Sequence, residues 1–301
     1  MVKIMNNFLT ESYIMEANHY LGLQKDYLNA ILANLATINN SADLTKQSIK
    51  WRDEIFAPRD MFSAFEEVEN WQIPEQAPLM PLIVLFSGIA QMRQFYKTHQ
   101  ISDNIFNDTI ADIARNMGES KLRSGKYIIE PFVFNWLVNH ITCRVFHLGR
   151  LQFEPRRINE DYTLLKPGDY VINTHIPAGG KLPYNEIHNS YRQAIELFSR
   201  LTPSIEYKGF ICESWMLSPQ LKEILDESSN LVQFLSDYEI YYTEDDESFY
   251  TYVFTNKTDN PNDLPENSTL QRAIKQHLLA GGKIELGCGF IPMNKISEQI
   301  I

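Results

Sequence analysis

The spacing of the apolar residues changes once along this chain, near residue 142, and this change limits the folds that the sequence can adopt. From the N-terminus to residue 125, apolar residues recur at steps of three and four, the period of an amphipathic helix. Further along, stretches that alternate between apolar and polar residues are followed by new helical stretches. We therefore expect an α+β protein of two domains, with an all-helical domain over residues 1–141 and a mixed β-sheet flanked by helices over residues 142–301.

The helices of the first domain are predicted from their apolar stripes and their end signals. Tyr27, Ile31 and Leu35 form one such stripe. Ser102 is a suitable N-cap, and Gly118 marks the expected end of the helix that follows it. The predicted helical segments are residues 27–38, 44–56, 58–71 and 101–118, followed by one that ends near His140.

The second domain is predicted to interleave strands and helices. Residues 144–158 alternate as a strand does, and Lys166–Asp169 fits a type II turn because Pro167 fixes the first φ and Gly168 supplies the positive one. A strand over Val171–Ile176 comes next. The later elements are expected to be a helix over 184–201, a strand over 207–217, a helix over 218–238, strands over 239–244 and 248–254, a helix over 268–282 and a strand over 283–291.

Charge and composition exclude several classes of protein. A net charge of −11 argues against a general nucleic-acid binder. The longest apolar run, residues 79–90, contains a proline and a glycine and is shorter than the ~20 residues that span a bilayer. The N-terminal residues lack the apolar core of a signal peptide, and the three cysteines lie far apart, so we expect no disulfide framework. The sequence predicts a cytoplasmic protein with neither nucleic-acid nor membrane partners.

The acidic residues concentrate in residues 237–267, a segment that contains a single lysine. Such a segment is typical of a solvated surface that keeps a protein soluble. It is also able to attract a cationic substrate by its field. Both interpretations remain open from the sequence.

The connection from the strand at Val171–Ile176 to the next helix has the composition of an anion-binding loop. If the helix begins near Pro183, its unpaired first-turn N–H groups and partial positive charge point back at the loop. Gly179 and Gly180 permit backbone conformations and a close approach that side chains would block, and Lys181 adds a positive charge. Pro177, which has no N–H, is expected to end the strand pairing there.

His175, at the exit of that strand, is the candidate for acid–base chemistry because histidine changes its charge near neutral pH. The alternative interpretation is a satisfied histidine of the core. Metal binding is not expected, because neither the Glu186/His188 pair nor the His140/His147 pair has the spacing of metal ligands.

Five collinear segments resemble those of bacterial acyltransferase-domain proteins, which have a helical N-terminal domain and a C-terminal domain similar to the GNAT-type N-acetyltransferases. The segments are Gly149–Glu154, Gly168–Leu182, Cys212–Leu221, Ser228–Phe234 and Leu264–Ala273. The resemblance implies a GNAT-like mixed sheet flanked by helices in the second domain. It also implies acetyl-CoA or another acyl-CoA as co-substrate.

In that superfamily the acyl-CoA lies between two parallel strands that diverge, and its pyrophosphate sits on the loop after the first of them. The resemblance implies Ile172–Pro177 as the first strand and Gly209–Leu217 as the second. It implies cofactor-binding roles for Ile176, Ala178, Gly179, Gly180, Lys181 and Leu182.

Acyl transfer to an amine needs a polarised thioester carbonyl, a neutral amine and a proton for the leaving thiolate. A backbone N–H near Ile176 is expected to polarise the carbonyl, and His175 is the predicted base. Glu154 is predicted to act through water or to hold a cationic amine; the alternative is a simple ion pair with Arg150 or Arg156.

Ser214 and Cys212 lie two residues apart on the second strand, so they share a face and are the candidates for the proton donor. Cys212 is alternatively a nucleophile with His175 as its base, or a small buried apolar residue.

The sequence thus favours an N-acyltransferase that moves an acyl group, such as acetyl, from acyl-CoA to the amine of a small acceptor, which the acidic segment predicts to be cationic. One alternative is a non-catalytic GNAT-like module that binds a ligand or a partner, because the pyrophosphate signature of the superfamily is replaced by the shorter "PAGGKL". Another alternative is an acyl hydrolase that depends on Cys212 and His175.

Overall fold

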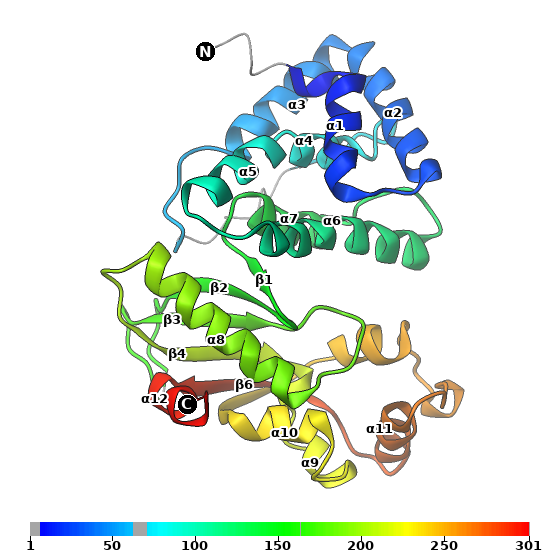
Figure 1. The fold of residues 1–301 in the computed structure, drawn as a ribbon. Helices are drawn as coiled ribbons and strands as arrows, with labels where there is room; N and C mark the ends of the chain where they lie inside the picture. Colours follow the sequence, from blue (N-terminus) through cyan, green and yellow to red (C-terminus); the bar gives the residue numbers. More distant parts are fainter. Residues whose placement is uncertain (1–6, 63–70, 163, 301) are drawn as a thin grey trace. The chain divides into compact units, whose positions relative to one another are not determined.

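The chain divides into two compact units, Met1–His147 and Leu148–Ile301, and each is described by itself. The computed structural model describes residues 7–62, 71–162 and 164–300 (Figure 1). The amphipathic segment predicted at 58–71 includes residues 63–70, which lie outside this part of the chain. The predicted α+β class, helical first and then built on a mixed sheet, is confirmed.

The described part of the first unit is helical. Its helices are η1 (Asn7–Leu9), α1 (Glu11–Leu21), α2 (Lys25–Asn39), α3 (Ala42–Ile55), α4 (Met80–Phe86), α5 (Ile89–Thr98), α6 (Asp103–Ser124) and α7 (Pro131–Ile141). Every residue of α4 is buried, and α1, α2, α3 and α7 pack against it. A helix that is apolar on all sides needs such surroundings, so α4 forms the centre of this unit.

The helix α6 extends further than the sequence predicted. Gly118 was expected to end it, but the helix continues to Ser124, and Gly125 takes the left-handed conformation at its C-cap with φ +69°. A glycine inside a helix costs about 1 kcal/mol relative to alanine. Burial of Met117 and Ser120 along the same face offsets that cost.

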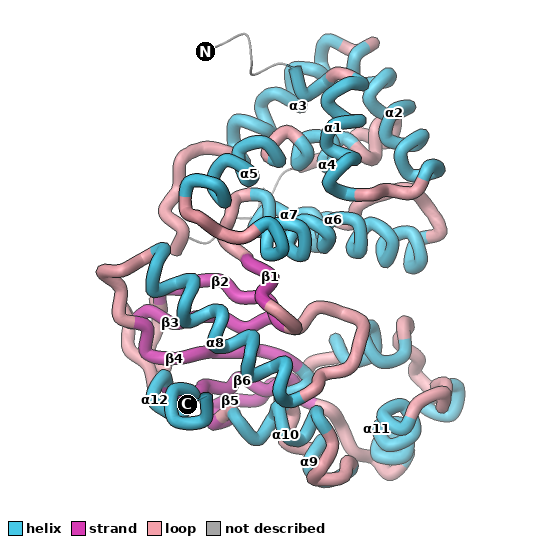
Figure 2. The backbone as a smooth tube through the Cα atoms, in the orientation of Figure 1, coloured by secondary structure: helices cyan, strands magenta, loops and turns pink. Residues whose placement is uncertain are grey.

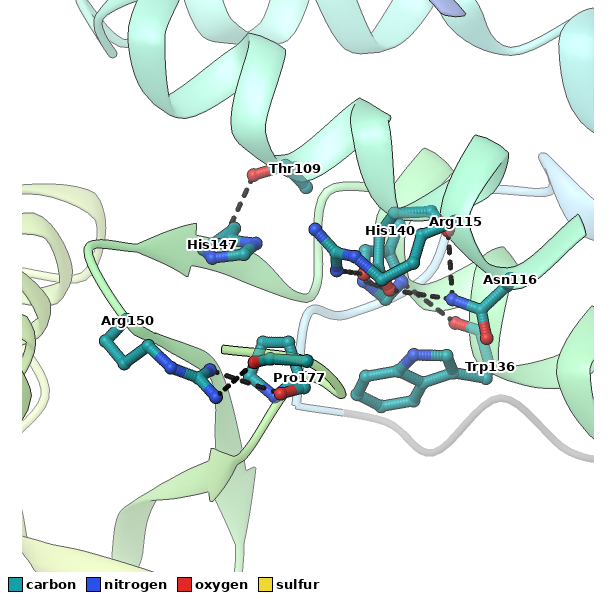
Figure 3. Close-up of polar contacts among 10 residues, drawn as sticks. Thr109, Arg115, Asn116, Trp136, His140, His147, Arg150 and Pro177 are labelled. Carbon is teal, nitrogen blue, oxygen red and sulfur yellow. Dashed lines mark hydrogen bonds and ion pairs between the residues drawn. The ribbon is translucent and has the colours of Figure 1, made fainter. Parts of the chain in front are cut away.

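A buried polar network joins α6 to α7 (Figure 3). His140 Nε2 lies 3.1 Å from Asp112 Oδ2, and His140 Nδ1 lies 3.1 Å from the carbonyl oxygen of Trp136. Arg115 pairs with the other oxygen of Asp112, and Asn116 Nδ2 donates to Asp112 Oδ2 at 3.1 Å. Both ring nitrogens of His140 thus lie near oxygen atoms, one on α6 and one on α7, so the ring links the two helices.

The second unit is built on a six-stranded mixed sheet in the order β1-β2-β3-β4-β6-β5 (Figure 2). The strands are β1 (Phe146–Leu148), which crosses the boundary between the units, β2 (Leu151–Arg157), β3 (Tyr170–His175), β4 (Tyr207–Ser214), β5 (Glu239–Asp245) and β6 (Glu285–Pro292). Only β3 and β4 pair in parallel among the strand pairs with a described register; β2–β3, β4–β6 and β5–β6 are antiparallel.

Helices cover one face of this sheet. The helix α8 (Tyr184–Leu201) packs on β2, and its neighbours α10 (Asn230–Asp237) and α12 (Met293–Ile300) pack against it (Figure 1). Tyr191 of α8 contacts the rings of Phe153 and Phe210, so these strand residues define the α8 face of the sheet. The remaining helices of the unit are η2 (Trp215–Leu217), α9 (Leu221–Ile224), η3 (Tyr250–Phe254), η4 (Pro261–Asp263) and α11 (Thr269–Leu279).

For this unit, the prediction of the Lys166–Asp169 turn is confirmed, and the predictions for residues 218–238 and 248–254 are wrong. The Lys166–Asp169 turn has Gly168 at φ +97° and a hydrogen bond from Asp169 N to Lys166 O of 3.0 Å, as a type II turn requires. Residues 218–238 form two helices, α9 and α10, rather than one.

The strand predicted at 248–254 is wrong, because Tyr250–Phe254 is a π-helical turn. Phe249, Tyr250 and Phe254 are all buried, and that spacing suits a helical turn rather than a strand.

Among the described residues, no helix is long and apolar enough to cross a membrane.

Candidate active site

The loop between β3 and α8 has the conformation that its glycines predicted. Gly179 and Gly180 have φ of +82° and +73°, a region that side chains disfavour. The helix was predicted to begin near Pro183; Pro183 is the N-cap of α8, so the helix begins at Tyr184, and within the described chain no side chain caps this end. Glu186 N and Ile187 N both bond to the Pro183 carbonyl, at 3.0 and 3.1 Å, so the N–H groups before them remain available to a ligand.

Arg150 fixes the shape of this loop. One of its Nη atoms donates to the carbonyl oxygen of Pro177 at 3.1 Å (Figure 3). Its other Nη atom donates to the carbonyl oxygen of Gly179 at 2.8 Å, and its Nε donates to that of Lys181 at 2.8 Å. The guanidinium therefore satisfies the loop carbonyls and places a positive charge beside the loop. From the sequence, Arg150 is predicted only as a possible partner of Glu154, because nothing local signals a contact with residues about 30 positions away.

Gly149, the residue before Arg150, allows the β1–β2 turn to approach Ser190 of α8 closely. Gly149 has φ +67°, and a Cβ there would lie 2.7 Å from Ser190 Oγ. Ser190 Oγ accepts a hydrogen bond from Arg150 N at 2.8 Å, which fixes the β1–β2 turn to α8.

The two parallel strands separate before the end of β3. β3 pairs with β2 along its whole length, up to His175 opposite Gln152. In the described register with β4, the last pair is Asn173 opposite Ile211, while β4 itself continues to Ser214. The pairing was predicted to stop at Pro177, but on the β4 side it stops four residues earlier. Because this ladder ends at Asn173, inside β3 and before Pro177, the proline does not cause the separation.

Glu154, Asn173 and His175 form a polar cluster on the sheet face opposite α8, which we call the His175 face. Glu154 Oε1 lies 3.4 Å from His175 Nε2 and accepts a hydrogen bond from Asn173 Nδ2 at 3.0 Å. Asn173 Nδ2 also lies 3.2 Å from His175 Nε2. Burial alone would raise the pKa of Glu154, but the hydrogen bond and charge of His175, with the Asn173 hydrogen bond, outweigh burial and lower it to about 2.

The two predicted ion-pair partners of Glu154 make their direct contacts with other groups, although the charge of Arg156 also lowers the pKa of Glu154. Arg156 Nη1 lies 3.6 Å from Glu213 Oε1, and Arg150 bonds to the loop carbonyls. The structure thus brings His175 and Glu154 together and adds Asn173, which sequence analysis missed because a buried strand offers no signal for a polar cluster.

Cys212 is separated from His175 by the sheet. Since Ile211 is paired with Asn173 and side chains alternate, Ile211 and His175 share one face, and Cys212 lies on the α8 face. Cys212 is fully buried, and burial raises the pKa of its thiol. This placement contradicts the interpretation of Cys212 as a nucleophile with His175 as its base and supports the alternative, a buried apolar residue.

Ser214 ends β4 and has a local structural contact. Its Oγ accepts a hydrogen bond from Met216 N at 3.1 Å, at the start of η2. Its role as proton donor stays a prediction.

A buried pair of tyrosines lies on the α8 face near Cys212. The hydroxyls of Tyr191 and Tyr238 are 2.7 Å apart, and burial raises the pKa of both well above the ordinary value. After burial, the nearby Cys212 also contributes to the raised pKa of both hydroxyls. Nothing local in the sequence signals this pair, since the contact of Tyr238 with α8 depends on tertiary packing.

The first turn of α8 is fixed to α10 by one carboxylate. Tyr184 Oη donates to Asp237 Oδ1 at 2.8 Å, and His188 Nε2 lies 3.1 Å from Asp237 Oδ2. Burial and this hydrogen bond raise the pKa of Tyr184 to about 12. His188 is thus a contact of Asp237, and no group of three potential metal ligands occurs among the described residues.

The acidic segment at 237–267 is partly neutralised by lysines. Lys283 Nζ lies 2.7 Å from Asp245 Oδ1, Lys257 Nζ lies 2.8 Å from Glu247 Oε1, and Lys275 pairs with Glu266 at 2.8 Å. Attraction of a cationic acceptor by this segment stays a prediction.

Two family descriptions match this chain. The N-acyltransferase N-terminal domain matches residues 12–143, and the GNAT-like C-terminal domain matches residues 145–291. The chain therefore belongs to the family of acyltransferase-domain proteins that joins these two domains, as the five resembling segments predicted.

Solved structures of acyltransferases share the fold. A mutant acyltransferase, orf11*, in complex with octanoyl-CoA is 21% identical, with a TM-score of 0.78 over 92% of this chain and 87% of that chain. An acyltransferase in complex with decanoyl-CoA is 24% identical, with a TM-score of 0.77 over 92% of this chain and 86% of that chain.

A further acyltransferase, in complex with CoA and 10C-teicoplanin, is 21% identical, with a TM-score of 0.77 over 93% of this chain and 87% of that chain. These similarities show that the chain has the acyltransferase fold. No curated protein matches it.

Proposed function

We propose that this chain is an acyl-CoA-dependent N-acyltransferase that transfers an acyl group to the amine of a small acceptor. The observation that carries the proposal is the early end of the β3–β4 ladder at Asn173 and Ile211, next to a loop and helix start with available N–H groups. Separated parallel strands leave backbone groups for a ligand, and a helix N-terminus suits a phosphate.

The proposed CoA site uses the residues implied by the family resemblance. The pyrophosphate would lie on Ala178–Leu182 and accept hydrogen bonds from the first-turn N–H groups of Tyr184 and Asn185. Lys181 and Arg150 contribute positive charge on this loop. The acyl carbonyl would be polarised by a backbone N–H near Ile176, where β3 no longer pairs with β4.

The proposed chemistry takes place on the His175 face. His175 accepts the proton that the acceptor nitrogen loses when it attacks the thioester, and the adjacent ionised Glu154 stabilises the resulting imidazolium at 3.4 Å. The new amide bond forms as the carbon–sulfur bond breaks, and the CoA thiolate takes a proton. Ser214 remains the predicted donor of that proton, and alternation along β4 places it on the α8 face with Cys212, so in this proposal the thiolate is protonated from the side of the sheet opposite His175. Tyr238 is a further candidate on that same side, because burial keeps its hydroxyl protonated at neutral pH.

Medium-chain donors belong in the proposal beside acetyl-CoA. Acyltransferases of the same fold have been solved with octanoyl-CoA and decanoyl-CoA. Acetyl-, octanoyl- and decanoyl-CoA should therefore all be offered to the protein.

Isothermal titration calorimetry of the full chain with these esters tests the site, and release of free CoA thiol in the presence of primary amines tests the reaction. We expect binding to each accepted ester and turnover that His175→Ala and Glu154→Gln reduce while binding of CoA remains. Absence of heat with every CoA ester would overturn the proposal. Binding without turnover in the unchanged protein would instead support the non-catalytic module.

A further inference from the structure

Asn173 is an unusual residue for its position. It lies in the central part of β3 between two apolar neighbours, Val171 and Ile172, and a buried Thr174, and only 6% of it is exposed. Asparagine is depleted in strands, and burying an amide costs free energy unless its hydrogen bonds are made. Valine or isoleucine would fill this position at lower cost, so the amide needs another explanation.

The amide of Asn173 meets the two groups of the proposed acid–base pair. Its Nδ2 donates to Glu154 Oε1 at 3.0 Å and lies 3.2 Å from His175 Nε2. An amide NH₂ group has two hydrogens and no acceptor. The contact with His175 is therefore a hydrogen bond only when Nε2 carries a lone pair, that is, when the ring is neutral at this nitrogen.

The same nitrogen has the opposite relation to Glu154. An ionised carboxylate only accepts hydrogen bonds, so the 3.4 Å approach of Glu154 Oε1 to Nε2 is favourable only when Nε2 carries a proton. Nε2 thus has a partner in each protonation state: Asn173 when it is bare and Glu154 when it is protonated. Asn173 and Glu154 are hydrogen-bonded to each other, so the His175 ring needs to move little when Nε2 gains or loses its proton.

We propose that Asn173 is a positioning residue that favours the neutral, proton-accepting form of His175 and so opposes the effect of Glu154. The inference rests on the proposed function, in which His175 is the base. During transfer, an N–H bond of the acceptor nitrogen breaks, an Nε2–H bond forms, and the imidazolium exchanges its Asn173 contact for Glu154.

Other ionisable groups on the His175 face do not reverse this balance. Arg156 on β2 and Glu213 on β4 lie 3.6 Å apart, and the charge of Arg156 acts on Glu154, whose pKa it lowers. Tyr241 on β5 and Cys288 on β6 keep their protons at neutral pH, because burial raises both pKa values. Glu154 is therefore the anion that acts most directly on His175.

The test compares Asn173→Val with Glu154→Gln in the full chain. Loss of the amide should move the acid limb of the rate–pH profile upward by about half to one pH unit, the shift expected from one hydrogen bond. Loss of the Glu154 charge should move it downward. Asn173→Thr, whose hydroxyl is able to donate one hydrogen bond and which suits a strand, should lie close to the unchanged protein.

An NMR titration of the His175 ring in the same proteins separates this inference from the proposed function, because it needs no turnover. Opposite displacements in Asn173→Val and Glu154→Gln support the inference, even if no acyl-CoA is turned over. A folded Asn173→Val protein whose His175 titrates as in the unchanged protein, or is displaced in the same direction as in Glu154→Gln, overturns it. If Asn173→Val does not fold, Asn173→Ala, which also lacks a hydrogen-bond donor, replaces it under the same criteria.

Discussion

The contact between Arg150 and the loop after β3 leads to a quantitative prediction about CoA binding. The guanidinium makes three hydrogen bonds to the carbonyl oxygens of Pro177, Gly179 and Lys181. Two of them are exposed to solvent, so each bond is expected to contribute about 0.5–1 kcal/mol to the order of the loop. Their sum is about 1.5–3 kcal/mol, which corresponds to a roughly 10- to 100-fold weaker affinity in Arg150→Ala.

The matched control is Arg157→Ala, which removes the same charge from the exposed far end of β2. It should leave CoA affinity within about twofold of the unchanged protein, since a lone surface charge contributes little. Arg150→Lys keeps the charge but not the planar group of donors, so its affinity should lie between the two.

Isothermal titration calorimetry with CoA measures all three variants, and circular dichroism checks that each is folded. If Arg150→Ala binds CoA as tightly as Arg157→Ala, the loop does not need these hydrogen bonds and the reasoning is refuted. If Arg150→Lys binds CoA as tightly as the unchanged protein, the positive charge alone explains the effect, and the planar arrangement of the guanidinium donors is not needed.

Three further predictions concern stability and the loop. His140→Ala should lower the free energy of unfolding by about 1–3 kcal/mol in urea denaturation, because it removes one partner of the buried Asp112, which keeps Arg115 and Asn116; the exposed His19→Ala is the control, and equal losses in the two would contradict a stabilising contact between His140 and Asp112. The pKa of Glu154 in the folded protein, about 2, lies below its ordinary value of 4.5, so its stabilising effect is present above pH 4.5 and is lost as the pH falls through 2. The difference in unfolding free energy between the unchanged protein and Glu154→Gln should therefore shrink as the pH falls from 4.5 to about 2. A difference that stays constant over this pH range would contradict the lowered pKa of Glu154. Gly179→Ala should weaken CoA binding about tenfold, since φ of +82° costs a side chain about 1–2 kcal/mol, whereas Gly118→Ala inside α6 should leave CoA binding unchanged; equal affinities would mean that the loop conformation is not needed.

Much of the secondary structure could be predicted because its signals are local. The stripe of α8, the type II turn at Lys166–Asp169 and the glycines of the loop each depend on residues a few positions apart. The predictions fail where a local signal misleads. Gly118 is a helix-end signal that the burial of Met117 and Ser120 overrides, and residues 248–254 are aromatic enough to resemble a strand although they form a π-helical turn.

The sequence by itself determined the two-domain class, the family and the loop at Ala178–Leu182, since these are carried by periodicity and by short motifs. Only the tertiary structure decided which side chains meet: it pairs Glu154 with Asn173 across β2 and β3, places Cys212 on the opposite face from His175, and brings Arg150 to the loop carbonyls. The register between strands depends on the packing of distant segments, and a shift of one residue would move each of these side chains to the other face.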